Sequence, residues 1–208
     1  YVTLSRSVSS VRIANTSGLD VSYRSTGFGH SMVLNIVEGD SILWVEDGGE
    51  YGTLTLKTEE YVRSIVERAR LAEVKAPRVS GEIPVVFTAR QVPSILRSIE
   101  LGVNGLSMLK GETPLVGREG EKVLGTVTVT DDPLVDGAPG SRPFDDEGVP
   151  SRRTVLFDGG VFRSFLYDLY TAAATGKEST ASARRNMLSA PSIGSSNMVM
   201  SAGDSSLG

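Results

Sequence analysis

Residues 142–165 constrain the fold of this chain more than any other stretch. An acidic turn punctuated by Gly and Pro, residues 142–153, leads directly into the alternating run 154–157. Asp158-Gly159-Gly160 follows, and its glycines can adopt the positive φ angles of a tight reversal. The pattern predicts an antiparallel hairpin that continues to residue 165. Its expected faces are Val155 with Phe157 and Thr154 with Leu156.

The rest of the second half mixes strand and helix signals. Residues 83–87 are an apolar run of strand length, and an i, i+3, i+4, i+7 stripe over 92–103 predicts an amphipathic helix. Residues 123–130 favour a strand, and 165–174 resemble a helix. From Ser179 onward we expect extended chain along the edge of the same domain.

The first 57 residues predict an antiparallel meander. The β-rich runs are 11–15, 20–24, 28–37 and 41–45, with turn signals at 16–18 and 38–40. Asp47-Gly48-Gly49 is expected to close this unit.

Residues 58–73 predict the clearest helix in the chain. Thr58 is the expected N-cap, and Glu59 and Glu60 lie in the first turn, where they favour the helix dipole. Apolar residues recur at helical spacing on one side. They are Tyr61, Val62, Ile65, Val66, Ala69 and Ala72.

A short linker bracketed by Pro77 and Gly81 marks the best domain boundary. We therefore expect residues 1–76 to form a central β-meander and helix, and residues 77–208 a β-rich C-terminal domain. The predicted fold class is α+β, with an antiparallel β-meander region, a linking helix and a β-rich second domain.

The charge and composition of the chain argue against nucleic-acid binding and membrane insertion. A net charge of −4 and a pI of about 5.2 give no sign of the basic face that nucleic-acid binding needs, so we expect no such partner. No apolar run approaches the roughly 18 residues of a membrane span, so no membrane partner is expected. The absence of Cys excludes disulfides and thiolate ligands, and favours a cytoplasmic location. A start at Tyr1 indicates a piece of a longer protein.

The sequence contains few residues of the types that metal or nucleophilic catalysis requires. His30 is the only histidine, whereas a zinc site draws three or four closely spaced ligands from His, Cys and carboxylates. A strand histidine on a polar face is the favoured interpretation. A Ser-His-Asp triad is nearly excluded, and the Gly-rich turns match neither a P-loop nor a Rossmann motif. We expect no catalytic residue, metal or cofactor in this chain.

Carboxylates gather in one stretch of the second half. They are Asp131, Asp132, Asp136, Asp145, Asp146 and Glu147. Oxygen ligands at this density suit a hard cation, although the spacing matches no EF-hand loop. The favoured alternative is that this acidic loop caps turns and pairs with nearby arginines. Those arginines are Arg142, Arg152 and Arg153.

Arg184-Arg185-Asn186 adds a paired-arginine segment, which can hold a carboxylate or phosphate bidentately. The simpler interpretation is that it neutralises the acidic loop. Together with one downstream Asn these residues form a candidate substrate-binding or structural group. Its members are Asp131, Asp132, Asp145, Asp146, Glu147, Arg184, Arg185 and Asn197.

The order of these motifs resembles the TldD/TldE (PmbA) metallopeptidase-related family, once labelled modulators of DNA gyrase. The resemblance is most specific between Gly125 and Met200, and a second patch covers residues 11–23. The motifs in family order are Asp131-Asp132, Gly140-Ser141, 144–148, Arg152-Arg153, Asp158-Gly159-Gly160, Ser179-Thr180, Arg184-Arg185-Asn186 and Pro191 with Asn197.

The resemblance implies a metal site of two His and one Cys in the active member, TldD, with His-Glu-x-x-x-His on a helix. At the matching place this chain reads Arg97-Ser98-Ile99-Glu100-Leu101-Gly102, and it has no Cys. It therefore resembles the TldE (PmbA) side, implied to pair with TldD in a cytoplasmic heterodimer that trims unfolded peptides.

The sequence thus predicts a non-catalytic subunit of a TldD/TldE-type peptidase that acts on unfolded peptides. Two alternatives stay open. One is a self-associating homodimer that binds peptides without a role in proteolysis. The other is a metal-dependent hydrolase that uses the acidic loop.

Overall fold

The computed structural model describes every residue except 55–56, 75, 187 and 204–208. The described chain separates into two compact units. The first comprises residues 1–9, 24–86 and 137–139, and the second 10–23, 87–136 and 140–208. Helices and antiparallel sheets occur together, so the predicted α+β class is confirmed. The boundary expected between residues 76 and 77 stays a prediction.

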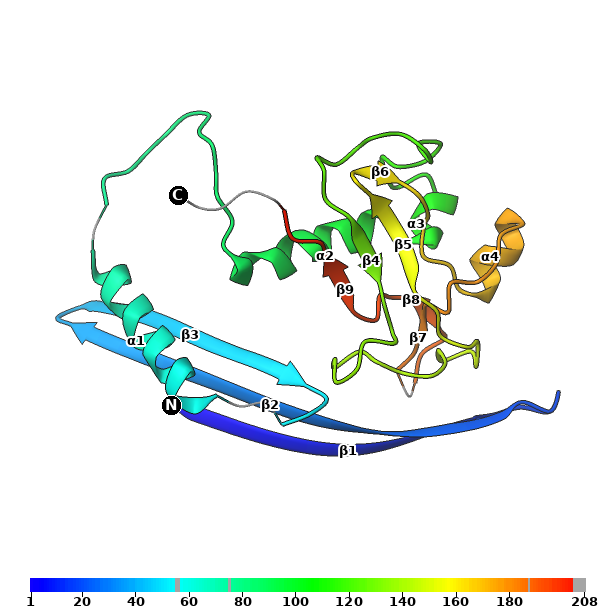
Figure 1. Cartoon of the computed structure of the whole chain (residues 1–208), viewed down its shortest axis with the longest axis horizontal. Coiled ribbons are helices and arrows are strands. Elements are labelled where there is room, and N and C mark those ends of the chain that lie inside the picture. The colour runs from blue at the N-terminus through cyan, green and yellow to red at the C-terminus, as the bar shows by residue number, and fades with distance from the viewer. Residues whose placement is uncertain (55–56, 75, 187, 204–208) are drawn as a thin grey trace. The chain divides into compact units, whose positions relative to one another are not determined.

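Three long strands form the predicted meander (Figure 1). They are β1 (Val2–Ala14), β2 (Asp20–Glu38) and β3 (Ser41–Tyr51). The β2–β3 register runs without a shift from Phe28 opposite Tyr51 to Glu38 opposite Ser41. Gly48 and Gly49 lie inside β3, so the expectation that they close the unit is wrong. The two glycines pair with Ser31 and His30, and this pairing carries the strand past them.

Helix α1 (Thr58–Glu73) has the predicted bounds. Its N-cap is Lys57, which makes no side-chain capping bond, so the expected cap at Thr58 is wrong and Thr58 is the first helical residue. Ile65 and Ala69 are buried against one face of the meander. The sheet residues around Val45 that pack with them are Met32, Leu34, Ile36 and Leu43.

Residues 83–87 form no strand, although all five are described. Pro84 cannot donate to a ladder, and Val85 and Val86 are more than 60% exposed. The chain then enters a single 3-10 turn, η1 (Ala89–Gln91). The predicted helix that follows is confirmed as α2 (Val92–Gly102), and α3 (Gly105–Leu109) continues after a break.

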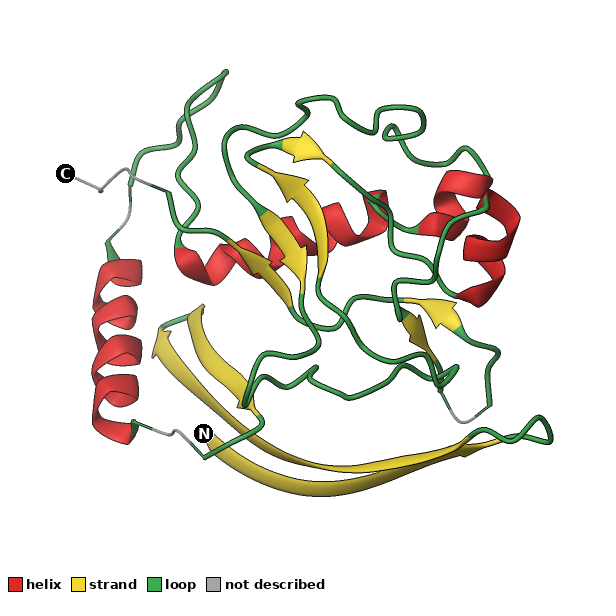
Figure 2. Ribbon diagram, turned by 45° about the vertical axis from the view of Figure 1, so that its right-hand side comes forward, coloured by secondary structure: helices red, strands yellow, loops and turns green. Residues whose placement is uncertain are grey.

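The second unit holds a four-stranded sheet in the order β6-β5-β4-β9, with α2 lying across one face (Figure 2). The strands are β4 (Val129–Asp131), β5 (Thr154–Asp158), β6 (Val161–Phe162) and β9 (Met198–Met200). The strand expected at 123–130 is mostly wrong, because only its last two residues enter β4. The amides of Val123 and Leu124 bond to the carbonyl of Gly160, so this stretch wraps around the hairpin turn instead.

The predicted hairpin is present as β5 and β6, although β6 ends at Phe162. Gly159 and Gly160 both have positive φ, 55° and 88°, as expected. The expected alternation of faces is wrong. A register shift against β4 places Val129 opposite Phe157 but Thr130 opposite Val155. This irregularity buries Leu156 and Phe157 together.

Helix α4 (Leu169–Thr175) begins later than the predicted 165–174. Residues 165–168 are not helical, because Leu166 instead exchanges backbone hydrogen bonds with Val103 and Gly105. The tail is extended as expected in its described part. It contributes β7 (Ala183–Arg184), β8 (Ser192–Ile193) and the edge strand β9.

The main core lies between this sheet and its helices. Its fully buried members are Val103, Val129, Leu156, Phe162 and Leu166, and Phe165 packs edge-on against Phe162 at 4.8 Å. Among the described residues no helix combines the length and apolarity needed to cross a membrane.

Candidate functional site

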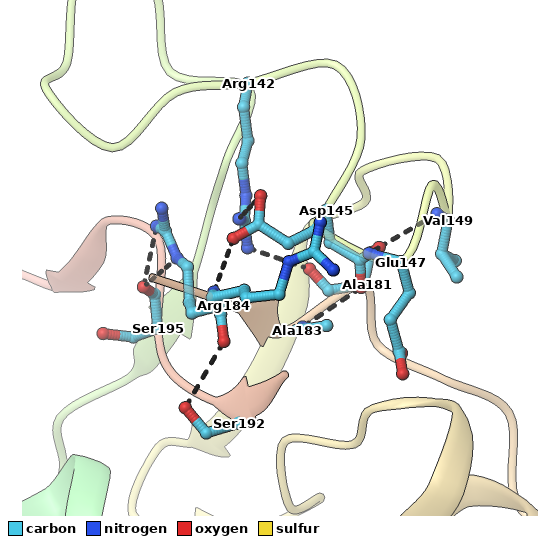
Figure 3. Close-up of polar contacts among 11 residues, drawn as sticks. Arg142, Asp145, Glu147, Val149, Ala181, Ala183, Arg184, Ser192 and Ser195 are labelled. Atoms are coloured by element: carbon cyan, nitrogen blue, oxygen red, sulfur yellow. Dashed lines mark hydrogen bonds and ion pairs between the residues drawn. The ribbon is translucent and has the colours of Figure 1, made fainter. Parts of the chain in front are cut away.

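Asp145 is the buried centre of the acidic loop, with no exposed surface. One carboxylate oxygen accepts the amides of Glu147 and Val149 at 3.0 and 2.9 Å. The other accepts the amide of Ala183, in β7, at 3.1 Å (Figure 3). A carboxylate with three backbone donors is satisfied without a cation. The geometry gives Asp145 the contacts of a turn cap that also holds a strand.

Asp146 contacts both β7 and the residue that follows this strand. Its carboxylate accepts the amide of Arg185 at 2.7 Å, and its own amide donates to the carbonyl of Ala183. The Arg185 side chain is exposed, so the backbone of Arg185, rather than its charge, meets the acidic loop.

Arg142 lies under this loop and is 5% exposed. Its guanidinium donates to the carbonyl of Ala181 at 3.4 Å and lies 4.0 Å from the Asp146 carboxylate. Its Nε finds no partner within the described chain. Burial, together with the neighbouring charge of Arg184, lowers the pKa of Arg142.

Arg184 points to the loop that precedes β9. Its Nε and Nη2 both donate to the carbonyl of Ser195, at 3.2 and 2.9 Å. These two guanidinium donors already have an acceptor in the Ser195 carbonyl oxygen, so they need no carboxylate or phosphate to satisfy them. The position of Ser195 is therefore set from β7.

Two carboxylates from different elements hold two consecutive serines. Glu100, on α2, accepts both the amide and the hydroxyl of Ser195, at 2.7 and 2.6 Å. Asp131, on β4, accepts the amide and hydroxyl of Ser196, both at 2.7 Å. Burial raises the pKa of Asp131, and the two bonds from Ser196 only partly offset that effect.

Asp132 and Asn197 tie the next residues together. The Asn197 side chain donates to the Asp132 carbonyl at 2.8 Å and to the Ser141 hydroxyl at 3.0 Å. It accepts the amide of Gly140 at 2.8 Å. The Gly140 position is closely packed, since an added Cβ would lie 2.2 Å from the Ser196 carbonyl oxygen. The motif Gly140-Ser141 therefore supplies two of the hydrogen-bond partners that hold the Asn197 side chain.

Glu147 turns away from the others. Its carboxylate accepts the amide of Leu169, the first residue of α4, at 2.8 Å. Burial raises the pKa of Glu147, and the nearby carboxylates of Asp168 and Asp145 act in the same direction. Glu147 thus connects the acidic loop to α4.

Most of the predicted group is brought together in one polar cluster of the second unit. The members linked through β7 and the loop before β9 are Asp131, Asp132, Asp145, Asp146, Arg184, Asn197 and, by its backbone, Arg185. Sequence reasoning missed Glu100, Ser195 and Ser196. Glu100 lies 95 positions from Ser195, so no local pattern could have paired them.

The expected arginine partners are only partly those predicted. Arg142 approaches Asp146, and Arg153 lies 3.9 Å from Asp132. Arg152 instead pairs with Glu178 at 3.0 Å and donates to the carbonyl of Ser179. Whether this cluster serves a structural or a substrate-binding role stays a prediction.

The residues on α2 do not fit the metal site that the family resemblance implies. Arg97 is exposed, and the Ser98 hydroxyl donates to the Ser94 carbonyl of its own helix. Gly102, at the end of the motif, has no side chain. His30 lies on β2 of the first unit, stacked on Tyr51 and edge-on to Tyr61. Within the described residues no group of three His, Cys, Asp or Glu could hold a metal.

Two family models together match nearly the whole chain. Residues 1–73 match a model of the PmbA/TldA metallopeptidase central domain, and residues 80–208 match that of the C-terminal domain. A metalloprotease of Methanothermobacter thermautotrophicus is 34% identical over 70% of this chain and 32% of its own length. A TldD homolog metalloprotease of Haemophilus influenzae is 30% identical over 76% of this chain and 30% of its own length.

The solved structure of TldE from Thermococcus kodakarensis superposes with a TM-score of 0.86. The two sequences are 27% identical, and the match covers 99% of this chain and 48% of that one. The chain therefore spans about half, or less, of the length of these relatives.

Proposed function

Because this chain belongs to the PmbA/TldD metallopeptidase family, we propose that it acts as the TldE-like subunit of a two-subunit metallopeptidase. In that assembly a TldD-type partner supplies the metal-bound water that hydrolyses the peptide bond. The substrates are unfolded peptides, and the location is the cytoplasm, which suits a chain without cysteine.

One observation carries the proposal. Helix α2 presents Arg97, Ser98 and Gly102 where the family resemblance places His-Glu-x-x-x-His. The two His positions hold a guanidinium and a residue without a side chain, so no pair of imidazoles lies on this helical face. Ser98, at the Glu position, donates its hydroxyl to its own helix. The similarity to TldE over nearly the whole chain supports the same assignment.

The polar cluster then has a structural role in a subunit of this kind. Glu100 occupies the inner side of α2 and fixes Ser195 rather than a metal. The carboxylates of Asp131 and Asp145 are likewise taken up by backbone and hydroxyl donors. The subunit would shape the chamber and orient an extended substrate, which lowers the entropic cost of the partner's chemistry.

The test is degradation of an unfolded peptide by the purified TldD-type partner, by this protein and by their mixture. We expect cleavage only in the mixture, or at a rate well above that of the partner by itself. Activity of this protein after rigorous removal of the partner would overturn the proposal. Partner activity that this protein leaves unchanged would favour the homodimer that binds peptides without cleaving them.

Elemental analysis separates the remaining alternative. We expect no stoichiometric, chelator-sensitive zinc in the purified protein. Stoichiometric divalent metal, lost together with activity when Asp145 and Asp146 are replaced by Asn, would favour a hydrolase that uses the acidic loop.

A further inference from the structure

The β-meander of the first unit carries an apolar pocket of about 280 Å³. Leu4 of β1, Phe28 and His30 of β2, Tyr51 of β3 and Leu54 contribute side chains to it. Phe28 and His30 have the same parity along β2 as Met32 and Leu34, which pack on α1. The pocket therefore opens on the face of the sheet that α1 covers further along.

The back wall of this pocket is preorganised. The rings of His30 and Tyr51 are parallel within 3° at 5.7 Å, and Tyr61 meets His30 edge-on at 4.0 Å. Tyr51 folds over Gly49, where an added Cβ would lie 2.8 Å from the ring hydroxyl. His30 Nε2 is buried and has no hydrogen-bond partner among the described residues. A wall of stacked rings presents a flat apolar surface at small entropic cost to a ligand.

The rim of the pocket is exposed and contains one charge. Leu4 and Leu54 are 66% and 69% exposed, so both side chains are accessible to a ligand from solvent. Among the described residues of the lining, Arg6 is the one that carries a formal charge, so a ligand with a nearby carboxylate is favoured.

The pocket also borders a strand edge. In the described sheet β1 is an outer strand, and residues 4–6 belong to it. A peptide that pairs with an outer strand projects alternate side chains to one face of the sheet. Such a peptide along β1 brings a side chain to the mouth of the pocket.

We propose that this pocket receives a Phe, Tyr or Leu side chain of an extended peptide that has an acidic residue next to it. The proposal rests on the proposed function and adds a preference among unfolded peptides. The preferred peptide places an apolar side chain in the pocket and the carboxylate of the neighbouring residue close to Arg6. A pocket of this size accommodates one such side chain, not a folded partner.

Fluorescence anisotropy with a labelled unstructured peptide containing one Phe-Glu pair tests the anchor. We expect Leu4→Ser in the protein, or Phe→Ala in the peptide, to raise the Kd about tenfold. Val8→Ser is the matched control, because Val8 lies four residues further along the same strand, is 52% exposed and is outside the lining. Equal Kd values for Leu4→Ser and Val8→Ser would overturn the proposal.

The charge is tested separately with a Phe-Gln version of the peptide. We expect wild type to bind the Phe-Glu peptide about threefold more tightly, and Arg6→Gln to abolish that difference. The exposed Arg97→Gln serves as control. A preference for Glu that survives Arg6→Gln would show that Arg6 does not recognise the peptide.

The outcomes separate this proposal from the proposed function. Cleavage by the mixture with the TldD-type partner, combined with no effect of Leu4→Ser on binding, would reject the pocket only. Pocket-dependent binding, combined with no cleavage by the mixture, would reject the subunit role only.

Discussion

The amide of Ala183 donates a 3.1 Å hydrogen bond to the fully buried carboxylate of Asp145, 38 positions earlier in the chain. The same carboxylate holds the amides of Glu147 and Val149. One side chain thereby closes a local turn and attaches a distant strand to it.

Asp145→Ala should therefore cost more than the about 1 kcal/mol of a single lost cap. The buried amide of Ala183 and the partly buried amides of Glu147 and Val149 would lose their acceptor. At about 1 kcal/mol or more for each, we expect a loss of at least about 3 kcal/mol in the free energy of unfolding. Urea denaturation measures it. Asp158→Ala is the control, since Asp158 forms an exposed pair with Arg163 that contributes less than about 1 kcal/mol.

The effect should be the same with and without calcium or magnesium. A wild-type melting temperature that rises steeply with either ion, and no such rise in Asp145→Ala, would instead indicate a cation site.

Gly159 and Gly160 should respond differently to substitution by Ala. Both have positive φ, but an added Cβ at Gly160 would lie 2.1 Å from the Leu124 carbonyl oxygen, whereas none of the surroundings lies within 4 Å at Gly159. We expect Gly159→Ala to cost about 1 kcal/mol and Gly160→Ala several times more. Thermal unfolding compares them, and similar losses would contradict the close approach of Leu124.

Asp168 should stabilise α4 as a capping residue. Its carboxylate accepts the amide of Thr171 at 2.8 Å, and the Thr171 hydroxyl accepts the Asp168 amide. Asp168→Ala should cost about 1–2 kcal/mol in the free energy of unfolding, and Asp168→Asn should cost much less, because Asn also caps. Equal losses for the two variants would mean that the charge of Asp168, not its acceptor oxygen, is what matters.

Asp131 predicts a pH dependence. Its pKa is raised on folding from the ordinary value of 3.8, so the folded state binds this proton more tightly than the unfolded state. The resulting stabilisation of the folded state is complete below pH 3.8 and is lost as the pH rises through the raised pKa of Asp131. Relative to Asp131→Asn, which keeps an acceptor for Ser196, wild type should lose stability over that window. Urea unfolding at a series of pH values compares the two proteins, and a wild type that gains stability relative to Asp131→Asn as the pH rises would contradict the shift.

The local elements were the most predictable. Residues 58–73 carry an uninterrupted apolar stripe and two acidic residues in the first turn, and both signals act within the helix itself. The glycines at 159 and 160 needed only their own backbone freedom. Strand propensity gave a wrong prediction where the hydrogen-bond partner lies far along the chain. Residues 123–128 are rich in β-forming residues, yet backbone groups of this stretch bond to Gly160 in the hairpin turn.

The polar cluster was predicted in membership more than in arrangement. The acidic and arginine motifs pointed to Asp131, Asp145 and Arg184, but the partners of these side chains are mostly backbone groups. A backbone amide leaves no trace in the residue type, so Ala183 as the partner of Asp145 was invisible. Glu100 was missed for a different reason, because its partner Ser195 lies 95 positions away along the chain.

The late position of β9 has a consequence for synthesis. Strand β4 pairs with β5 on one side, but its other neighbour is formed by residues 198–200. While the nascent chain stops short of those residues, one edge of β4 presents unpaired amides and carbonyls to any other chain nearby. The vulnerable interval of this protein on the ribosome therefore lasts until residues 198–200 have emerged, however early the rest of the sheet has formed.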